Sequence, residues 1–152
     1  MRGKLRCERK QYTYSHERDI VPIEYRIVHQ RRLVLAKGHG TLTDQGIFGY
    51  QRDVWSLPEV GGYDELVDMT QVKDIALPST ERVRALASLS ADMDAPSRTS
   101  RFAIVAPSEF AFGLGRLYEI LRTHDDRRTK VVRVFRSLDE AKAFLDIRGT
   151  LP

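Results

Sequence analysis

The residue types that could do chemistry are spread thinly along this chain of 152 residues. There is one cysteine, and the four histidines have no partner ligand at the i, i+4 spacing of a zinc-binding helix. No G-x-S-x-G motif marks a nucleophilic serine, and the spacing of the serines suggests no Ser/His/Asp set. The sequence therefore predicts no catalytic residues, no metal site and no bound cofactor.

A pair of glycines, Gly113 and Gly115, resembles the first half of a G-x-G-x-x-G dinucleotide motif, but position 118 is a tyrosine. The pair also falls inside the helical pattern "EFAFGLGRLYEIL" rather than directly after a strand. Close packing of this helix is the favoured interpretation. The alternative is that the glycines open space for an apolar ligand beside Phe110, Phe112, Gly113 and Gly115.

A second candidate site is positively charged. Residues 122–136 contain six arginines and lysines against two aspartates. Arg127, Arg128 and Lys130 form a candidate patch for an anionic partner, such as an acidic protein, a phosphate or a lipid headgroup. The favoured alternative is a solvated loop that neighbouring acids balance. Aromatic residues are not interleaved with these arginines, so no RNA-stacking surface is expected.

A third candidate is the hydroxyl pair Ser79 and Thr80, which follows "DELVDMTQVKDIALP". Serine is a favoured residue at the start of a helix, where its oxygen accepts from a free backbone N–H. A phosphate at the same place would add about −2 charge to the helix N-terminus. The cap alone is favoured; the alternative is a regulatory or partner-binding loop that contains Asp74, Ser79 and Thr80.

Hydrophobic periodicity predicts the elements that hold these residues. "IEYRIVHQ" and "RLVLAKGHGTL" have the pattern of an antiparallel hairpin. "DELVDM", "RFAIVAP" and "VVRVF" are short strand patterns, and each precedes a helical pattern. The expected order is β-β-α-β-α-β-α-β-α, an α/β fold with a mixed, mostly parallel sheet.

Each helical pattern begins at a capping residue. Thr43 and Ser79 precede the first two, Ser108 or its neighbour opens the third, and Ser137 forms a capping box with Glu140 before the last. The third helix is expected to bury one face at i, i+4, i+7 and i+11, namely Phe110, Leu114, Leu117 and Leu121.

Composition indicates one soluble domain: 41% of residues are hydrophobic and 30% are charged. No segment approaches the roughly 20 apolar residues that span a bilayer, and the single cysteine suits a reducing cytoplasm. Residues 1–22 hold six Lys/Arg and three Asp/Glu, which is +3 of the net +4. We therefore expect a flexible basic leader (1–21), a nearly neutral domain (22–148) that does not bind nucleic acid, and a short tail (149–152).

Four segments of the chain resemble the STAS-like domains, and above all their SpoIIAA-like branch, which is often grouped with CRAL-TRIO lipid-binding domains. They are "GHGTLTDQGIFGYQRDVW", "YDELVDMTQV", "FAIVAPSEFAFGLGRLYE" and "VFRSLDEAKAFL". The likeness covers about residues 22–147 and implies a single STAS-like domain. Antagonist members carry an Asp-Ser-Ser-Gly loop with a phosphorylated serine. Here no acid directly precedes Ser79 and no glycine follows it, so the match is partial.

The resemblance implies a non-catalytic cytoplasmic module that regulates through protein partners. The kinship with CRAL-TRIO domains implies the alternative, a small protein that binds a lipid or another apolar ligand. An enzyme is the least favoured interpretation. A homodimer stays open, because the resemblance does not determine the oligomeric state.

Overall fold

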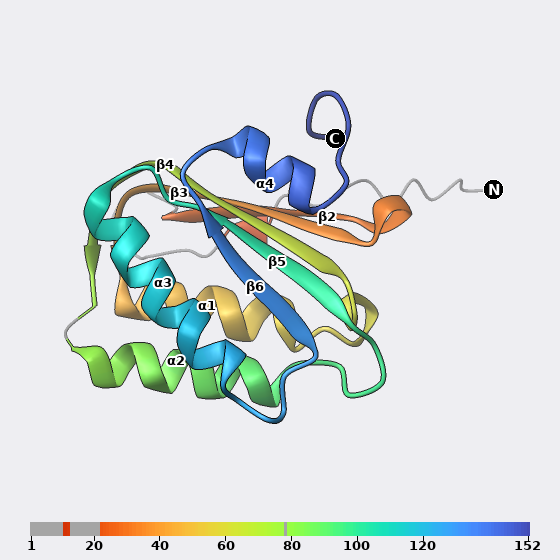
Figure 1. The fold of residues 1–152 in the computed structure, drawn as a ribbon, viewed down its shortest axis with the longest axis horizontal. Coiled ribbons are helices and arrows are strands. Elements are labelled where there is room, and N and C mark those ends of the chain that lie inside the picture. The colour runs from red at the N-terminus through yellow and green to blue at the C-terminus, as the bar shows by residue number, and fades with distance from the viewer. Residues whose placement is uncertain (1–10, 13–21, 78) are drawn as a thin grey trace.

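The computed structural model describes residues 11–12, 22–77 and 79–152. In chain order the elements are β1 (Gln11–Tyr12), β2 (Ile23–Val28), β3 (Leu33–Thr43), α1 (Asp44–Trp55), β4 (Asp64–Ala76), α2 (Thr80–Asp92), β5 (Ser100–Val105), α3 (Glu109–Thr123), β6 (Lys130–Phe135) and α4 (Leu138–Phe144), with 3-10 turns at His29–Arg31 and Pro58–Val60. The strands form one six-stranded sheet in the order β1-β2-β3-β4-β5-β6. Helices α1, α2 and α3 cover one face of it, and α4 lies on the other (Figure 1).

From β2 onward, the predicted order β-β-α-β-α-β-α-β-α is confirmed. Strands β2 and β3 are antiparallel, whereas β3, β4, β5 and β6 run parallel, so the sheet is mixed and mostly parallel. The short strand β1 pairs with β2 and falls within the predicted leader. The rest of that leader lies outside the described residues, and the predicted boundaries of leader, domain and tail stay predictions.

All four predicted helix starts are confirmed, because each capping oxygen accepts a hydrogen bond from a backbone N–H three residues later. The pairs are Thr43 with Gly46 (3.0 Å), Ser79 with Arg82 (3.3 Å), Ser108 with Ala111 (3.1 Å) and Ser137 with Glu140 (3.2 Å).

Strand β4 is longer than the predicted segment "DELVDM", since it covers 13 residues. Its second half pairs with β3 alone, because pairing with β5 ends at Asp68. Polar side chains occur in this half of the strand, so its sequence lacks the regular hydrophobic pattern from which strands are predicted. Asp74 is therefore a strand residue and not a loop residue; its carboxylate accepts from the backbone N–H of Ile75.

Helix α3 presents a different face to the sheet than its periodicity predicts. Phe110 is 59% exposed, and Leu114, Leu117 and Leu121 are only half-buried. The buried positions are Ala111, Gly115, Tyr118, Glu119 and Arg122. The cause is a close approach to β6: a Cβ at Gly115 would lie 3.1 Å from the methyl groups of Val134, so a small residue occupies the contact and the leucines flank it.

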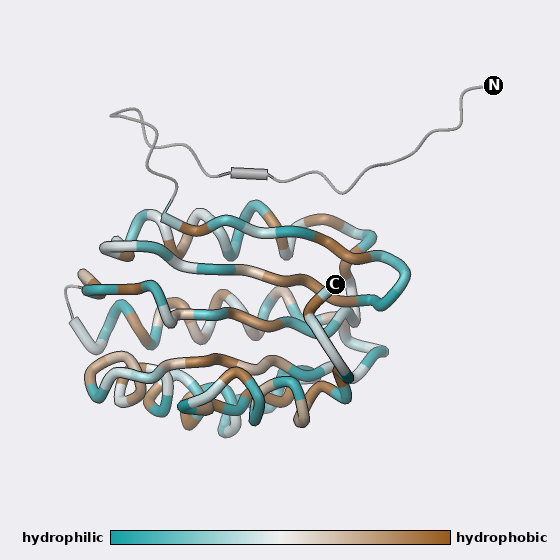
Figure 2. The backbone as a smooth tube through the Cα atoms, turned by 90° about the horizontal axis from the view of Figure 1, so that it is seen from above, coloured by the Kyte–Doolittle hydropathy of each residue, from teal (hydrophilic) through white to brown (hydrophobic). Residues whose placement is uncertain are grey.

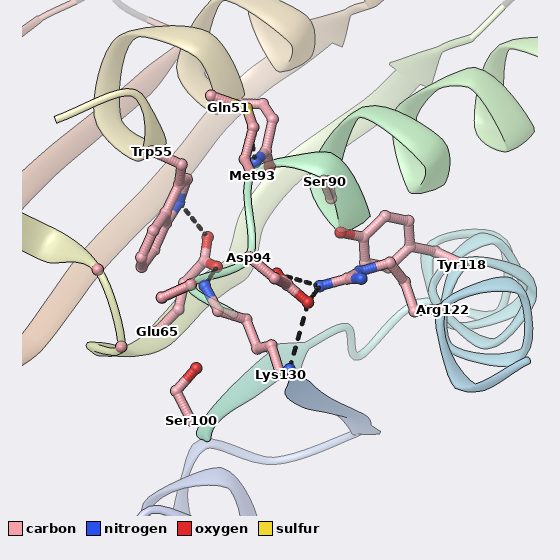
Figure 3. Close-up of a pocket in the computed structure, with 13 residues that line it drawn as sticks. Gln51, Trp55, Glu65, Ser90, Met93, Asp94, Ser100, Tyr118, Arg122 and Lys130 are labelled. Atoms are coloured by element: carbon pink, nitrogen blue, oxygen red, sulfur yellow. Dashed lines mark hydrogen bonds and ion pairs between the residues drawn. The ribbon is translucent and has the colours of Figure 1, made fainter. Parts of the chain in front are cut away.

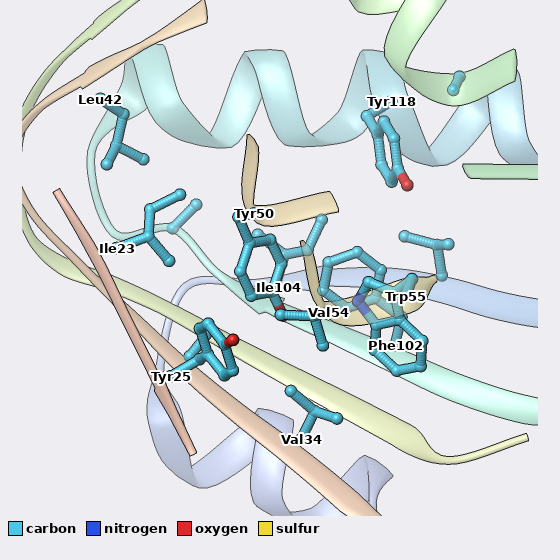
Figure 4. Close-up of a cluster of buried hydrophobic side chains, with 14 of the residues drawn as sticks. Ile23, Tyr25, Val34, Leu42, Tyr50, Val54, Trp55, Phe102, Ile104 and Tyr118 are labelled. Atoms are coloured by element: carbon cyan, nitrogen blue, oxygen red, sulfur yellow. The ribbon is translucent and has the colours of Figure 1, made fainter. Parts of the chain in front are cut away.

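Apolar side chains fill both sides of the sheet. Hydrophobic residues recur along the strands in Figure 2. The larger core lies between the sheet and α1–α3, with the aromatic rings of Tyr25, Tyr50, Trp55 and Phe102 at its centre (Figure 4). A smaller core lies beneath α4. Within the described ranges, every helix falls short of the length and hydrophobicity that a bilayer-spanning segment requires.

Candidate functional site

An apolar cavity lies between the sheet and the three helices that cover it. Its volume is about 120 Å³. The strands contribute Val67, Ile75 and Ile104, among others. All three helices contribute as well, for example through Ile47 of α1, Val83 of α2 and Leu114 of α3. The apolar part of this space does not attract ordered water, because water needs two to four polar partners.

The cavity runs toward the carboxyl ends of the parallel strands. Some of the lining residues at that end are half-buried, such as Ile47 in the first half of α1 and Leu77 just after β4. At the opposite end Tyr50, Phe102 and Tyr118 are buried. Open α/β sheets bind ligands at the carboxyl ends of their strands, so this cavity has the usual location of a ligand site.

The inner end of the apolar cavity is polar. Its wall there includes Gln51, Glu65 and the ring of Tyr118. Glu65 is buried, with 2% of its surface exposed. Its Oε2 accepts hydrogen bonds from the hydroxyl of Tyr50 at 2.8 Å and from the indole Nε1 of Trp55 at 3.3 Å. Burial, reinforced by the charge of Glu65, raises the pKa of Tyr50 well above its ordinary value, so the hydroxyl is a stable donor.

The other oxygen of Glu65 is paired with a buried lysine. The Nζ of Lys130 lies 3.2 Å from Oε1 of Glu65, and 3.2 Å from the centre of the Trp55 ring (Figure 3). Burial lowers the pKa of Lys130 because it disfavours the ammonium form, and Glu65 opposes that effect. The carboxylate, the ammonium and the indole ring thus hold one another in place.

A second buried ion pair lies beside the first. The Nη2 of Arg122 donates to both oxygens of Asp94, at 2.8 and 2.9 Å. Asp94 also accepts from the backbone N–H groups of Thr129 and Lys130, which holds the start of β6. A small cavity of about 10 Å³ lies beside the two pairs, and Gln51, Glu65 and Tyr118 line both it and the apolar cavity.

This architecture has a counterpart among solved structures. No protein-family model and no curated protein matches the chain. An uncharacterized protein of the DUF3478 family from Shewanella loihica PV-4, with a SpoIIAA-like fold, is similar at a TM-score of 0.53. It is 16% identical, and the match covers 86% of this chain and 99% of that one. This chain has a SpoIIAA-like fold. At this identity the similarity supports the fold alone.

The SpoIIAA-like fold puts the predicted regulatory residues at two separate elements. Ser79 and Thr80 are exposed at the start of α2, where Ser79 caps the helix. Asp74 lies on β4. The cap is thus present, and a regulatory role for this loop stays a prediction.

The predicted anionic-partner patch loses one of its members. Lys130 is buried, because as the first residue of β6 it faces α1–α3 and pairs with Glu65. Arg127 is half exposed, and it already contacts Asp92 and Asp125. Arg128 is exposed, and its Nη1 donates to a backbone carbonyl. Binding of an anionic partner stays a prediction for the two arginines.

The predicted ligand-cavity helix contributes one of its four residues to the cavity. Gly115 lines it, together with the neighbouring Leu114. Phe110 and Gly113 are exposed, and Phe112 packs under the guanidinium of Arg136 at 4.1 Å. The two phenylalanines point elsewhere because α3 is rotated relative to its predicted orientation.

Sequence reasoning missed the buried charges of Glu65, Asp94 and Arg122. One signal was available: Glu65 interrupts an apolar strand pattern at a position that shares its face with Val67. The pairing itself has no local signal, because Glu65 and Lys130 are 65 residues apart. Among the residues that the structure describes, no group of three or more His, Cys, Asp and Glu side chains could hold a metal ion.

Proposed function

We propose that this protein is a non-catalytic binding module that takes a small apolar molecule into the cavity between the sheet and α1–α3. The observation that carries the proposal is a cavity of about 120 Å³ with an almost wholly apolar lining. An apolar occupant would gain about 25 cal/mol for each Å² removed from water. The volume suits a compact ligand, since an engineered cavity of about 150 Å³ binds benzene.

The charged groups at the inner end favour binding over catalysis. Both oxygens of Glu65 are occupied, one by Lys130 and the other by Tyr50 and Trp55. A general base must have a free oxygen within hydrogen-bond reach of the proton that it removes. These side chains are better suited to holding β4, β6 and α1 around the ligand.

Native mass spectrometry of protein purified gently from its own host tests the proposal. We expect a discrete added mass on the wild type and its loss in Val67→Phe, which fills the cavity from β4. The matched control is Val131→Phe on the exposed side of β6, which should keep the added mass. A wild type that carries no added mass and binds no apolar compound supplied to it would refute the proposal.

A second candidate function is a regulatory one, in which a protein partner binds the start of α2. Val83 lines the cavity one turn after the exposed Ser79 and Thr80, so an occupant would contact the helix that displays them. If a partner binds there and phosphorylation releases it, Ser79→Asp should lose the partner in a pull-down and Ser79→Ala should keep it. Equal capture by both variants would count against this candidate.

A further inference from the structure

The guanidinium of Arg122 has hydrogen-bond donors that the described residues leave without an acceptor. The side chain is 1% exposed, and its Nη2 is occupied by Asp94. Its Nε and Nη1 are buried, and neither has a hydrogen-bond partner in the part of the chain that the structure describes. Buried donors in folded proteins nearly always have an acceptor. We therefore expect the acceptor for Arg122 to come from outside the chain.

Space for such an acceptor lies next to Arg122. The small cavity that Arg122 lines has a volume of about 10 Å³, which holds roughly one water-sized atom. Gln51, Glu65 and Tyr118, which are labelled in Figure 3, line this small cavity and also the apolar cavity, so the two cavities adjoin. A single oxygen fits this space.

The charge of the surroundings also selects the acceptor. The buried groups are two anions, Glu65 and Asp94, and two cations, Lys130 and Arg122, and they are paired one to one. An added carboxylate would therefore be an uncompensated buried charge, which is strongly unfavourable. An uncharged oxygen would satisfy the donors and leave the balance intact.

We infer that the ligand carries one uncharged acceptor oxygen, as in a ketone or an alcohol, and that Arg122 donates to this oxygen in the small cavity. The apolar part of the ligand fills the larger cavity, so the inference rests on the proposed function. Without a ligand, a water molecule occupies the small cavity and accepts from Arg122.

A titration of the ¹⁵N-labelled protein with three compounds of equal heavy-atom count tests the inference: heptane, hexan-2-one and pentanoate. Hydrophobicity alone would make heptane the tightest ligand. We expect hexan-2-one to bind about tenfold tighter than either of the others, a difference of about 1.4 kcal/mol. Binding of heptane as tight as that of hexan-2-one would overturn the inference and leave the proposed function standing. If none of the three binds, both fail.

The double variant Arg122→Met with Asp94→Asn removes the donors without leaving a buried charge. It should keep heptane binding and lose the preference for hexan-2-one; a folded variant that keeps the preference would overturn the inference. The Nε–Hε signal of Arg122 in the wild type gives a readout that needs no substitution. It should shift with hexan-2-one and not with heptane, and equal shifts with both would also overturn the inference.

Discussion

The ammonium of Lys130 reaches the carboxylate of Glu65 across an intervening strand. Lys130 begins β6 and Glu65 lies on β4, with β5 between them, yet Nζ and Oε1 are 3.2 Å apart. The register explains how: Ser100 on β5 lies beside Lys130, and Phe102 lies beside Glu65. The short side chain of Ser100 leaves room for the lysine to cross β5 on the helix-covered face.

Removal of Lys130 should be severely destabilising. Lys130→Met leaves the carboxylate of Glu65 buried without its cation, so we expect a loss of about 3–5 kcal/mol in the free energy of unfolding. Urea denaturation measures it. The double variant with Glu65→Gln should recover most of the loss, because neither charge is then buried. Lys73→Met, at an exposed position of β4, is the matched control and should change stability by less than about 0.5 kcal/mol. Equal effects of the two lysine substitutions would contradict the buried pair.

Substitution by alanine should have opposite effects on stability at two glycines of α3. A Cβ at Gly113 meets nothing within 4 Å, so Gly113→Ala should stabilise the protein by about 0.5–1 kcal/mol through helix propensity. A Cβ at Gly115 lies 3.1 Å from both methyl groups of Val134, a stiff β-branched side chain, so Gly115→Ala should be less stable than the wild type. Thermal unfolding compares the two. A gain at both positions would show that α3 can move away from β6.

The carboxyl of Asp125 should titrate at unusually low pH. Hydrogen bonds from the Arg127 side chain, and then from its backbone N–H, lower the pKa of Asp125 from 3.8 to about 2. Because the folded pKa is below the unfolded one, this interaction stabilises the fold above pH 3.8 and is lost as the pH falls through about 2. Carboxyl NMR should show the pKa returning toward 3.8 in Arg127→Gln. Arg128→Gln should leave it low, because Arg128 contacts only the backbone carbonyl of Asp125.

Two tyrosines should resist ionisation until the protein unfolds. Burial is the main cause of the raised pKa of Tyr50 and Tyr118, and the charge of Glu65 adds to it at Tyr50. In both tyrosines the folded pKa exceeds the unfolded value of 10.0. Their contribution to the stability of the fold is therefore complete below pH 10.0 and is lost as the pH rises above it. Phenolate absorbance should therefore rise for these two residues together with the loss of circular dichroism. Ionisation of Tyr50 in the folded protein would contradict the buried bond to Glu65.

Local signals predicted the element order and the four helix starts, because periodicity and capping depend on residues a few positions apart. The orientation of α3 was predicted wrongly for the opposite reason. Its buried face includes Arg122, whose partner Asp94 follows α2 and cannot be found from the helix alone. Lys130 looked like a surface charge for the same reason, since only the parallel register of three strands brings Glu65 to it. The apolar cavity forms between side chains from six or more elements, so no single segment of the sequence predicts it.

Because Lys130 reaches Glu65 across β5, the ion pair also disfavours incorrect registers of β6 in the sheet. A slip of β6 by one residue would turn Lys130 toward α4 and put Val131 on the face where Glu65 needs a cation. A misaligned sheet would thus bury a lone carboxylate, and only one alignment avoids this.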